Sequence, residues 1–228
     1  MRVALKLLGI VVIFMFMGLL LPLHAPGQGR QRLLQKFMKL CCRVMGVRIR
    51  FEGAYAGNAP KILIANHISY LDIFVIGSLF PTSFMGKLEL ESWPVLSHLG
   101  KFAQTVFVER TSVLSRLRAL YAVKRTMHES NYCIFPEGTT TSHVLPSSRN
   151  WHRGHALLHE QTRDGIYCLG LNYSDQTDIA WIGDDSLLPH LFKLLARKHV
   201  DVYVAGAYLP KSLTDRKEIA KESLRAVA

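Results

Sequence analysis

The first 50 residues of this chain lack acidic side chains, and the first carboxylate is Glu52. The same stretch carries +9 of the formal net charge of +11. Its lysines and arginines are Arg2, Lys6, Arg30, Arg32, Lys36, Lys39, Arg43, Arg48 and Arg50. Basic residues next to apolar sequence are typical of contact with anionic lipid head groups. A nucleic-acid partner is not expected, because it would need these charges spread over a soluble face.

Cysteine is also scarce, with four residues and no Cys-x-x-Cys pair. Cys41 and Cys42 are adjacent, which is a poor arrangement for a disulfide bond. We therefore expect reduced thiols and a main domain on the cytosolic side of a membrane. The length of 228 residues suits one domain with a short appendage, and 49% apolar residues exclude a disordered chain.

An uninterrupted apolar run extends from Leu7 to Leu23. As a helix its 17 residues would reach about 25 Å, slightly less than a bilayer core of about 30 Å. Arg2 and Lys6 precede the run, so a cleaved signal peptide is an alternative. No clear small-x-small cleavage site follows Leu23, which favours a retained membrane segment.

A second segment has helical periodicity with a basic face. Its apolar residues are Leu33, Leu34, Phe37, Leu40, Cys41, Val44 and Met45, and its basic residues are Arg32, Lys36, Lys39 and Arg43. This pattern predicts a helix lying in a membrane interface, with a surface helix packed on the domain as the alternative. We therefore expect a membrane-embedded helical hairpin over 1–46 and a second domain over 47–228. The expected location is the inner (cytoplasmic) membrane, with the domain facing the cytosol.

From Val47 onward, short apolar runs alternate with amphipathic stretches. Strands are predicted at 47–52, 61–65, 82–86, 104–108, 131–135, 166–173, 178–182 and 201–208. Helices are predicted at 70–79, 90–99, 112–129, 153–163, 186–198 and 213–225. Such alternation predicts an α/β fold in which helices cover a mostly parallel central sheet.

The strand ending at Ala65 is followed by a histidine and, five residues later, by an aspartate. Ligands of α/β sheets bind beyond the carboxyl ends of strands. His67 can accept a proton from a hydroxyl, and Asp72 can fix its tautomer and stabilise the cation. Contact between them requires His67 in the turn before the helix and Asp72 in its first turns. Asp72 could instead complete a capping box in which Ser69 caps the helix. That role is compatible with contact to His67.

Three further segments follow predicted strands and end in charged or small residues. They are Met85-Gly86-Lys87-Leu88-Glu89-Leu90, Phe107-Val108-Glu109-Arg110 and Phe135-Pro136-Glu137-Gly138-Thr139. The glycine of the last segment allows close backbone approach, and its hydroxyl can hold a polar group. No Gly-x-Ser-x-Gly motif is present, and no cysteine adjoins His67, so a covalent acyl-enzyme is not expected.

In this order, these motifs resemble the glycerolipid (lysophospholipid) acyltransferase family over about Val47 to Tyr173. That family is marked by a histidine, four residues and an aspartate, and by a later Phe-Pro-Glu-Gly-Thr. The later Trp151-His152-Arg153-Gly154-His155-Ala156 looks like the family's basic-plus-glycine stretch. The resemblance implies transfer of a fatty acyl group from acyl-CoA or acyl carrier protein to a lysophospholipid, with 1-acylglycerol-3-phosphate as the first candidate, and without a cofactor.

The resemblance also implies roles for single residues. His67 would be the general base and Asp72 its partner. Substrate-binding roles fall on Lys87, Arg110, Glu137, Gly138, Thr139 and Arg153, with Arg110 facing a phosphate.

One departure concerns the residue after Glu-Gly-Thr, where members acting on lysophosphatidate commonly have arginine and this chain has Thr140. Arg149 or Arg153 could substitute, or the acceptor could be another lysolipid such as a lyso-ornithine lipid. The segment Leu169–Tyr173 also lacks a proline that is common in the family.

Three alternatives complete the expectations from sequence. His152, His155 and His159 share a helical face, but nothing clearly completes a metal site, so no metal is expected. A catalytically silent lipid-binding protein is disfavoured because the His67 and Glu137 motifs are intact. A hydrolase using the same dyad would lack a nucleophilic serine motif.

Overall fold

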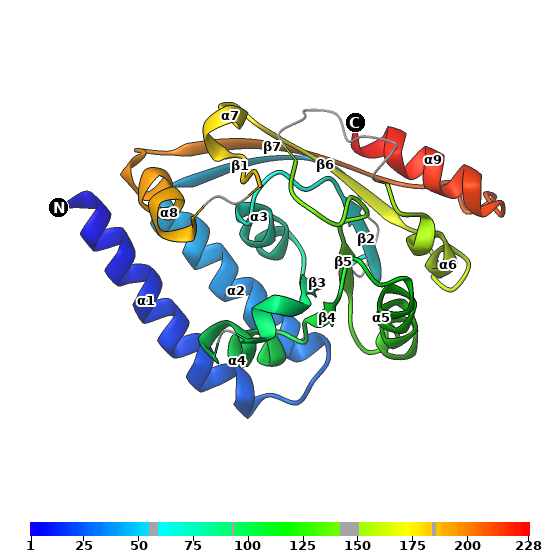
Figure 1. The fold of residues 1–228 in the computed structure, drawn as a ribbon, viewed down its shortest axis with the longest axis horizontal. Helices are drawn as coiled ribbons and strands as arrows, with labels where there is room; N and C mark the ends of the chain where they lie inside the picture. The colour runs from blue at the N-terminus through cyan, green and yellow to red at the C-terminus, as the bar shows by residue number, and fades with distance from the viewer. Residues whose placement is uncertain (55–58, 93, 142–150, 184–185) are drawn as a thin grey trace.

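The computed structural model describes residues 1–54, 59–92, 94–141, 151–183 and 186–228. A seven-stranded sheet forms its centre, with the order β1-β7-β6-β2-β5-β3-β4 (Figure 1). The strands are β1 (Val47–Gly53), β2 (Ile62–Ala65), β3 (Ser83–Lys87), β4 (Val106–Val108), β5 (Tyr132–Ile134), β6 (Tyr167–Tyr173) and β7 (Val200–Tyr208). All neighbouring pairs in this sheet are parallel except β6 and β7. The predicted mostly parallel sheet is confirmed.

Helices cover both faces of the sheet. One face packs against α1 (Arg2–Leu20), α2 (Gln28–Met45), α3 (Leu71–Leu79) and α8 (Leu187–Ala196). The other packs against α5 (Val113–Thr126), α6 (Ala156–His159) and α9 (Arg216–Val227). Successive side chains of β2 supply the two cores, with Leu63 facing the first and Ile64 the second. This alternation is the period of two that an extended strand imposes.

The two N-terminal helices pack against each other and join the first core. The apolar side of α2 is buried against α1, α3 and the sheet, whereas Arg32, Lys36 and Lys39 are exposed. Most of the apolar stripe of α2 is therefore covered by protein, as in the alternative of a surface helix packed on the domain, while Leu40 stays exposed. The physical reason is the apolar surface of α3, which α2 covers.

Helix α1 is apolar on all sides, but only one side is covered. Arg2–Leu23 has a mean hydropathy of 2.6 and is long and apolar enough to cross a membrane. Its inner side buries Ile13, Met17 and Leu21. The outer side exposes Leu5, Leu8, Val11, Val12, Met15, Phe16, Leu19 and Leu23.

A half-buried cation fixes α1 along the domain. The Lys6 Nζ donates to the carbonyl oxygens of Met45 and Arg197, at 2.7 Å and 2.8 Å. These carbonyls lie at the ends of α2 and α8, where the helix dipole favours a positive charge. Burial lowers the pKa of Lys6, and the nearby Arg2 lowers it further.

Three predicted elements differ from the structure in kind or length. The predicted strand 178–182 is replaced by α7 (Gln176–Ile179), where Asp178 pairs with Lys193 and Arg197 of the neighbouring α8 segment. The predicted helix 153–163 is shorter, a 3-10 turn (η3, Arg153–His155) followed by α6. The segment predicted as helix 90–99 consists of a 3-10 turn (η2, Leu88–Ser92) and α4 (Pro94–Phe102).

Candidate active site

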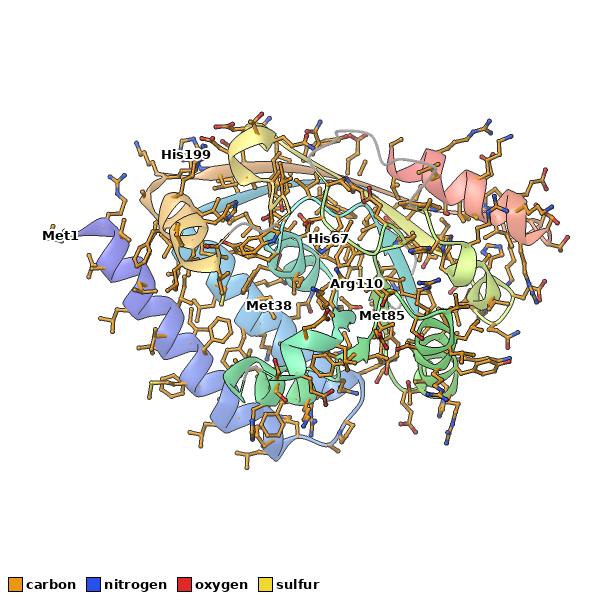
Figure 2. The ribbon with its side chains drawn as sticks, in the orientation of Figure 1. Met1, Met38, His67, Met85, Arg110 and His199 are labelled. Atoms are coloured by element: carbon orange, nitrogen blue, oxygen red, sulfur yellow. The ribbon has the colours of Figure 1, made fainter. Side chains whose placement is uncertain are left out.

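The predicted site residues gather where β2, β5 and β6 end. His67 follows β2, Glu137 follows β5, and Tyr173 is the last residue of β6. Asn66 joins two of these ends, because its amide donates to the Leu171 carbonyl at 2.9 Å and accepts from the Leu171 N–H at 2.8 Å. Figure 2 shows His67 near the centre of the molecule. Parallel strand ends therefore converge on one site, as expected for an α/β sheet.

His67 and Asp72 are in direct contact. The Nδ1 of His67 lies 2.9 Å from the Oδ2 of Asp72. His67 sits in the turn before α3, and Asp72 is the second residue of that helix. This is the arrangement that a five-residue spacing requires. The Asp72 side chain has no exposed surface and that of His67 is 7% exposed, so the pair is shielded from water.

The Asp72 carboxylate is saturated with donors. Its Oδ2 also accepts from the backbone N–H groups of Ile68 at 2.7 Å and Ser69 at 2.9 Å. Its Oδ1 accepts from the Tyr173 hydroxyl at 2.7 Å. Hydrogen bonds of this kind stabilise the ionised form of a buried carboxylate. Burial, reinforced by the Asp72 charge, raises the pKa of Tyr173 well above its usual range, so Tyr173 remains a donor.

The other ring nitrogen of His67 is available. Its Nε2 makes no hydrogen bond to any residue in the described part of the chain. The imidazole stacks on the Phe135 ring, with centroids 4.0 Å apart and planes 14° from parallel. Phe84 stacks in turn on Phe135. The ring is thus held in one plane while Nε2 stays free for an acceptor hydroxyl.

Glu137 points inward, toward the backbone of His67. Its Oε2 accepts from the His67 N–H at 2.8 Å, and its Oε1 accepts from the Thr141 hydroxyl at 3.1 Å. The Thr141 N–H donates to the His67 carbonyl at 2.8 Å. Burial raises the pKa of Glu137, against the lowering effect of these donors. The Oε2 contact therefore connects the β2 and β5 loops, and the Oε1 contact stays within the β5 loop. The resemblance had implied a substrate-binding role for Glu137.

Gly138 and Thr139 continue this turn toward solvent. Gly138 has φ of +69°, a conformation that favours glycine, and its N–H donates to the Phe135 carbonyl at 3.1 Å. Thr139 is exposed and Thr140 is half-buried. Both residues are thus placed where a ligand could reach them.

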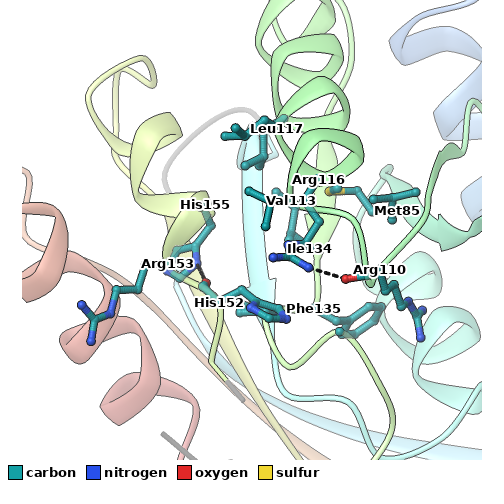
Figure 3. A pocket seen from close by; sticks show the side chains of 15 residues that line it. Met85, Arg110, Val113, Arg116, Leu117, Ile134, Phe135, His152, Arg153 and His155 are labelled. Atoms are coloured by element: carbon teal, nitrogen blue, oxygen red, sulfur yellow. Dashed lines mark hydrogen bonds between the residues drawn. The ribbon is translucent and has the colours of Figure 1, made fainter. Parts of the chain in front are cut away.

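A cavity of about 250 Å³ is lined in part by Phe135, the residue on which the histidine ring stacks (Figure 3). Most of its wall is apolar, and its polar side chains are cationic or imidazole groups. The wall consists of Met85, Val108, Arg110, Val113, Arg116, Leu117, Leu120, Ile134, Phe135, Pro136, Gly138, His152, Arg153, Gly154 and His155. Such a lining fits a hydrocarbon chain attached to an anionic group.

Arg110 is one of two predicted cations, with Arg153, that line this cavity. It is half-buried, and burial lowers its pKa while Glu89 opposes that effect. Arg116 donates to the Arg110 carbonyl, which fixes the loop after β4 (Figure 3). Arg110 therefore faces a partly dry site in which an anion is its natural partner.

The other predicted cations lie less centrally. Lys87 is exposed, pairs with Glu89 at 3.1 Å and lines no part of the cavity. Arg153 is also exposed, and Figure 3 shows its guanidinium pointing away from the other labelled side chains. Arg149 lies outside the described residues.

The three histidines proposed as a metal face have other contacts. In neutral His155, Nδ1 donates to the His152 carbonyl at 2.9 Å and Nε2 accepts from Ser223 at 2.8 Å. Lys211 donates to the His159 carbonyl at 2.7 Å. Within the described ranges, no group of three or more His, Cys, Asp or Glu side chains could hold a metal ion.

Sequence reasoning missed Tyr173, Asn66 and Phe135 as parts of the site. Tyr173 is 101 residues from Asp72 and Asn66 is 105 residues from Leu171. The signal for Tyr173 was its position at the end of a buried strand. That signal becomes specific only once β6 is known to pair with β2.

Comparison with known proteins agrees with this geometry. A family profile described as Acyltransferase matches residues 47–173. The chain belongs to the acyltransferase family. It is 32% identical to a lyso-ornithine lipid O-acyltransferase of Pseudomonas aeruginosa, over 87% of this chain and 78% of that protein. It is 33% identical to a 1-acyl-sn-glycerol-3-phosphate acyltransferase of Neisseria meningitidis, over 73% of this chain and 68% of that protein.

The fold of this acyltransferase matches a solved structure over its whole length. The crystal structure of the 1-acyl-sn-glycerophosphate acyltransferase from Thermotoga maritima aligns with a TM-score of 0.60 and 18% identity. The alignment covers 100% of this chain and 95% of that one. The N-terminal helices are thus included in the shared fold.

Proposed function

We propose that this acyltransferase moves a fatty acyl group from acyl-CoA or acyl carrier protein to the free hydroxyl of a lysolipid, in membrane lipid biosynthesis. The observation that carries the proposal is the His67–Asp72 pair. The Nδ1 of His67 is bonded to Asp72, which accepts from three further donors, and the Nε2 of His67 is free. A base with this geometry suits an alcohol that attacks an ester-like carbonyl.

The reaction needs no covalent intermediate. His67 Nε2 takes the proton of the acceptor hydroxyl as its oxygen attacks the thioester carbonyl. The carbon–sulfur bond then breaks, and the proton on Nε2 passes to the departing thiolate. Asp72 keeps the proton on Nδ1 and stabilises the imidazolium in between. Glu137 holds the His67 backbone and Phe135 packs on the imidazole, so both act as positioning residues.

The acceptor is proposed from two observations. Arg110 at the cavity provides a partner for the phosphate of 1-acylglycerol-3-phosphate. Thr140 stands where an arginine would supply a second guanidinium. Relatives of both kinds match this chain: three of the four named lyso-ornithine lipid O-acyltransferases match 84–87% of it and the fourth 47%, and the two Neisseria relatives match 73%. A lyso-ornithine lipid, whose head group carries a carboxylate, is therefore the second candidate acceptor.

The membrane contact is proposed for the outer side of α1. Exposed apolar side chains such as Leu8, Met15 and Leu19 would enter one leaflet while the inner side stays on the domain. Because Lys6 fixes α1 along the domain, we propose an interfacial position on the cytosolic side of the inner membrane. Protease should then spare the domain in intact cells and digest it in inverted vesicles, and the reverse pattern would exclude this orientation.

The chemistry is tested by measuring the turnover of the purified enzyme with both acceptors and both donors. His67→Ala should lower turnover by about 10²–10⁴-fold, the usual contribution of a general base. Asp72→Asn should also lower turnover severely, since the amide cannot accept from all four donors. His128→Ala, a change at an exposed histidine, is the control. Near-normal turnover of a folded His67→Ala enzyme would refute the mechanism.

A further inference from the structure

Helix α5 presents an apolar ridge to solvent. Its inner side buries Ala119, Leu120 and Val123 in the second core. Leu114, Leu117 and Tyr121 are 66%, 38% and 64% exposed on the opposite side. Spacings of three and four residues place these three side chains in one row along the helix. Nothing in the folding of the domain requires large apolar groups at these positions.

Basic residues flank the ridge without compensating acids. Arg118, Lys124 and Arg125 are exposed, and none forms an ion pair with any residue that the structure describes. By helical geometry Lys124 lies on one side of the ridge, and Arg118 and Arg125 lie on the other. The sequence from Arg110 to His128 contains no Asp or Glu. The outer face of α5 thus combines an apolar centre with an uncompensated positive border.

This face begins at the cavity and extends beyond it. Val113, Arg116, Leu117 and Leu120 contribute to the cavity wall. Arg125 lies eight residues after Leu117, which is about 12 Å along the helix axis. A ligand confined to the cavity would not reach Arg125, whereas a macromolecule that inserts a chain into the cavity would cover both.

The position of α5 argues against a lipid surface as its partner. The proposed membrane helix α1 packs on one face of the sheet and α5 on the other. Figure 1 shows α1 on the left of the molecule and α5 on the right. A bilayer that contacts the outer side of α1 therefore leaves α5 to the aqueous phase.

We propose that the outer face of α5 is the docking site for the acidic protein that carries the acyl thioester, an acyl carrier protein. The basic border attracts its acidic surface, the ridge packs against its apolar side chains, and its acyl arm enters the cavity. This inference rests on the proposed function, because it names the donor of that reaction. Binding through charge complementarity of this kind weakens steeply with salt.

The test is the affinity of fluorescently labelled acyl carrier protein for the detergent-purified enzyme, measured by anisotropy. Arg118→Glu combined with Arg125→Glu should weaken binding by about tenfold or more at low salt. The KM for the acyl-carrier-protein donor should rise in parallel, while kcat/KM for acyl-CoA should stay within about twofold of wild type. The control is Lys217→Glu with Lys221→Glu, which makes the same charge change on the exposed side of α9, a helix that covers the same face of the sheet.

Three outcomes would overturn the docking proposal. The first is no measurable binding of the carrier to the wild type. The second is an equal loss of kcat/KM for both donors, which would mean that the α5 cations contact a part of the substrate that the two donors share. The third is loss of vesicle binding in the α5 variant, which would assign the face to the membrane. Carrier binding without acyl transfer from either donor would instead refute the proposed function and leave the docking site intact.

Discussion

Removing one oxygen atom from Tyr173 tests how the histidine is activated. In Tyr173→Phe, the Asp72 Oδ1 loses its only donor among the described residues, while Oδ2 keeps its three. A hydrogen bond to a charged group contributes about 1.5–3 kcal/mol. If the whole amount is lost from the transition state, kcat falls by about ten- to a hundredfold. KM should stay close to wild type, because Tyr173 is buried and does not line the cavity.

The assay must separate positioning from general destabilisation. Steady-state kinetics across pH should show the acidic limb of the Tyr173→Phe profile at higher pH, since an undonated carboxylate favours the imidazolium. Tyr167→Phe is a matched control, a buried tyrosine facing the same core from the start of the same strand. Chemical denaturation of both variants measures any loss of stability. Wild-type kcat with an unshifted pH profile in a folded Tyr173→Phe enzyme would refute the reasoning.

Further predictions concern stability, acceptor choice and the membrane. Burial lowers the pKa of His155 from 6.5 to about 4. As the pH falls, His155 therefore becomes protonated in the unfolded state before it does so in the folded state. The free energy of unfolding should therefore fall by about 3 kcal/mol as pH drops from 6.5 to 4, and less in His155→Gln, by urea titration. Thr140→Arg should raise kcat/KM for lysophosphatidate relative to lyso-ornithine lipid by about tenfold or more, and an unchanged ratio would remove Thr140 from the head-group site. Leu8→Gln with Met15→Gln should reduce flotation with anionic vesicles but spare turnover of a short-chain lysolipid, because each buried side chain contributes about 1.5–3 kcal/mol.

The sequence predicted those parts of the site that are local in the chain. His67 and Asp72 share one turn and one helix start, so their contact follows from a spacing of five and the rule for strand ends. Glu137 was recognised as a strand-end carboxylate, but its direction depends on a backbone N–H 70 residues away. The contact between Tyr173 and Asp72 depends on the pairing of β6 with β2. Strand periodicity predicts which face a residue takes but does not predict which strands become neighbours.

The same limit explains the errors at the edges of the fold. The apolar stripe of α2 predicts burial correctly, but periodicity does not distinguish burial in protein from burial in lipid. The structure makes that distinction, because α2 packs against the apolar surface of α3. The segment 178–182 has the composition of a strand, but Asp178 forms ion pairs with Lys193 and Arg197 that place it in a helical turn.

Under these proposals, the two faces of the sheet receive different substrates, which constrains how the substrates meet. The lysolipid would come from the membrane on the side of α1 and place its head group near Arg110, whereas the thioester donor would come from the side of α5. The end of β2 lies between these sides, because β2 is central in the sheet and its residues feed both cores. The His67 imidazole stacks on Phe135, and Phe135 also lines the cavity. A base at the end of a central strand can therefore reach an acceptor from one side and a thioester from the other, without either substrate crossing the sheet.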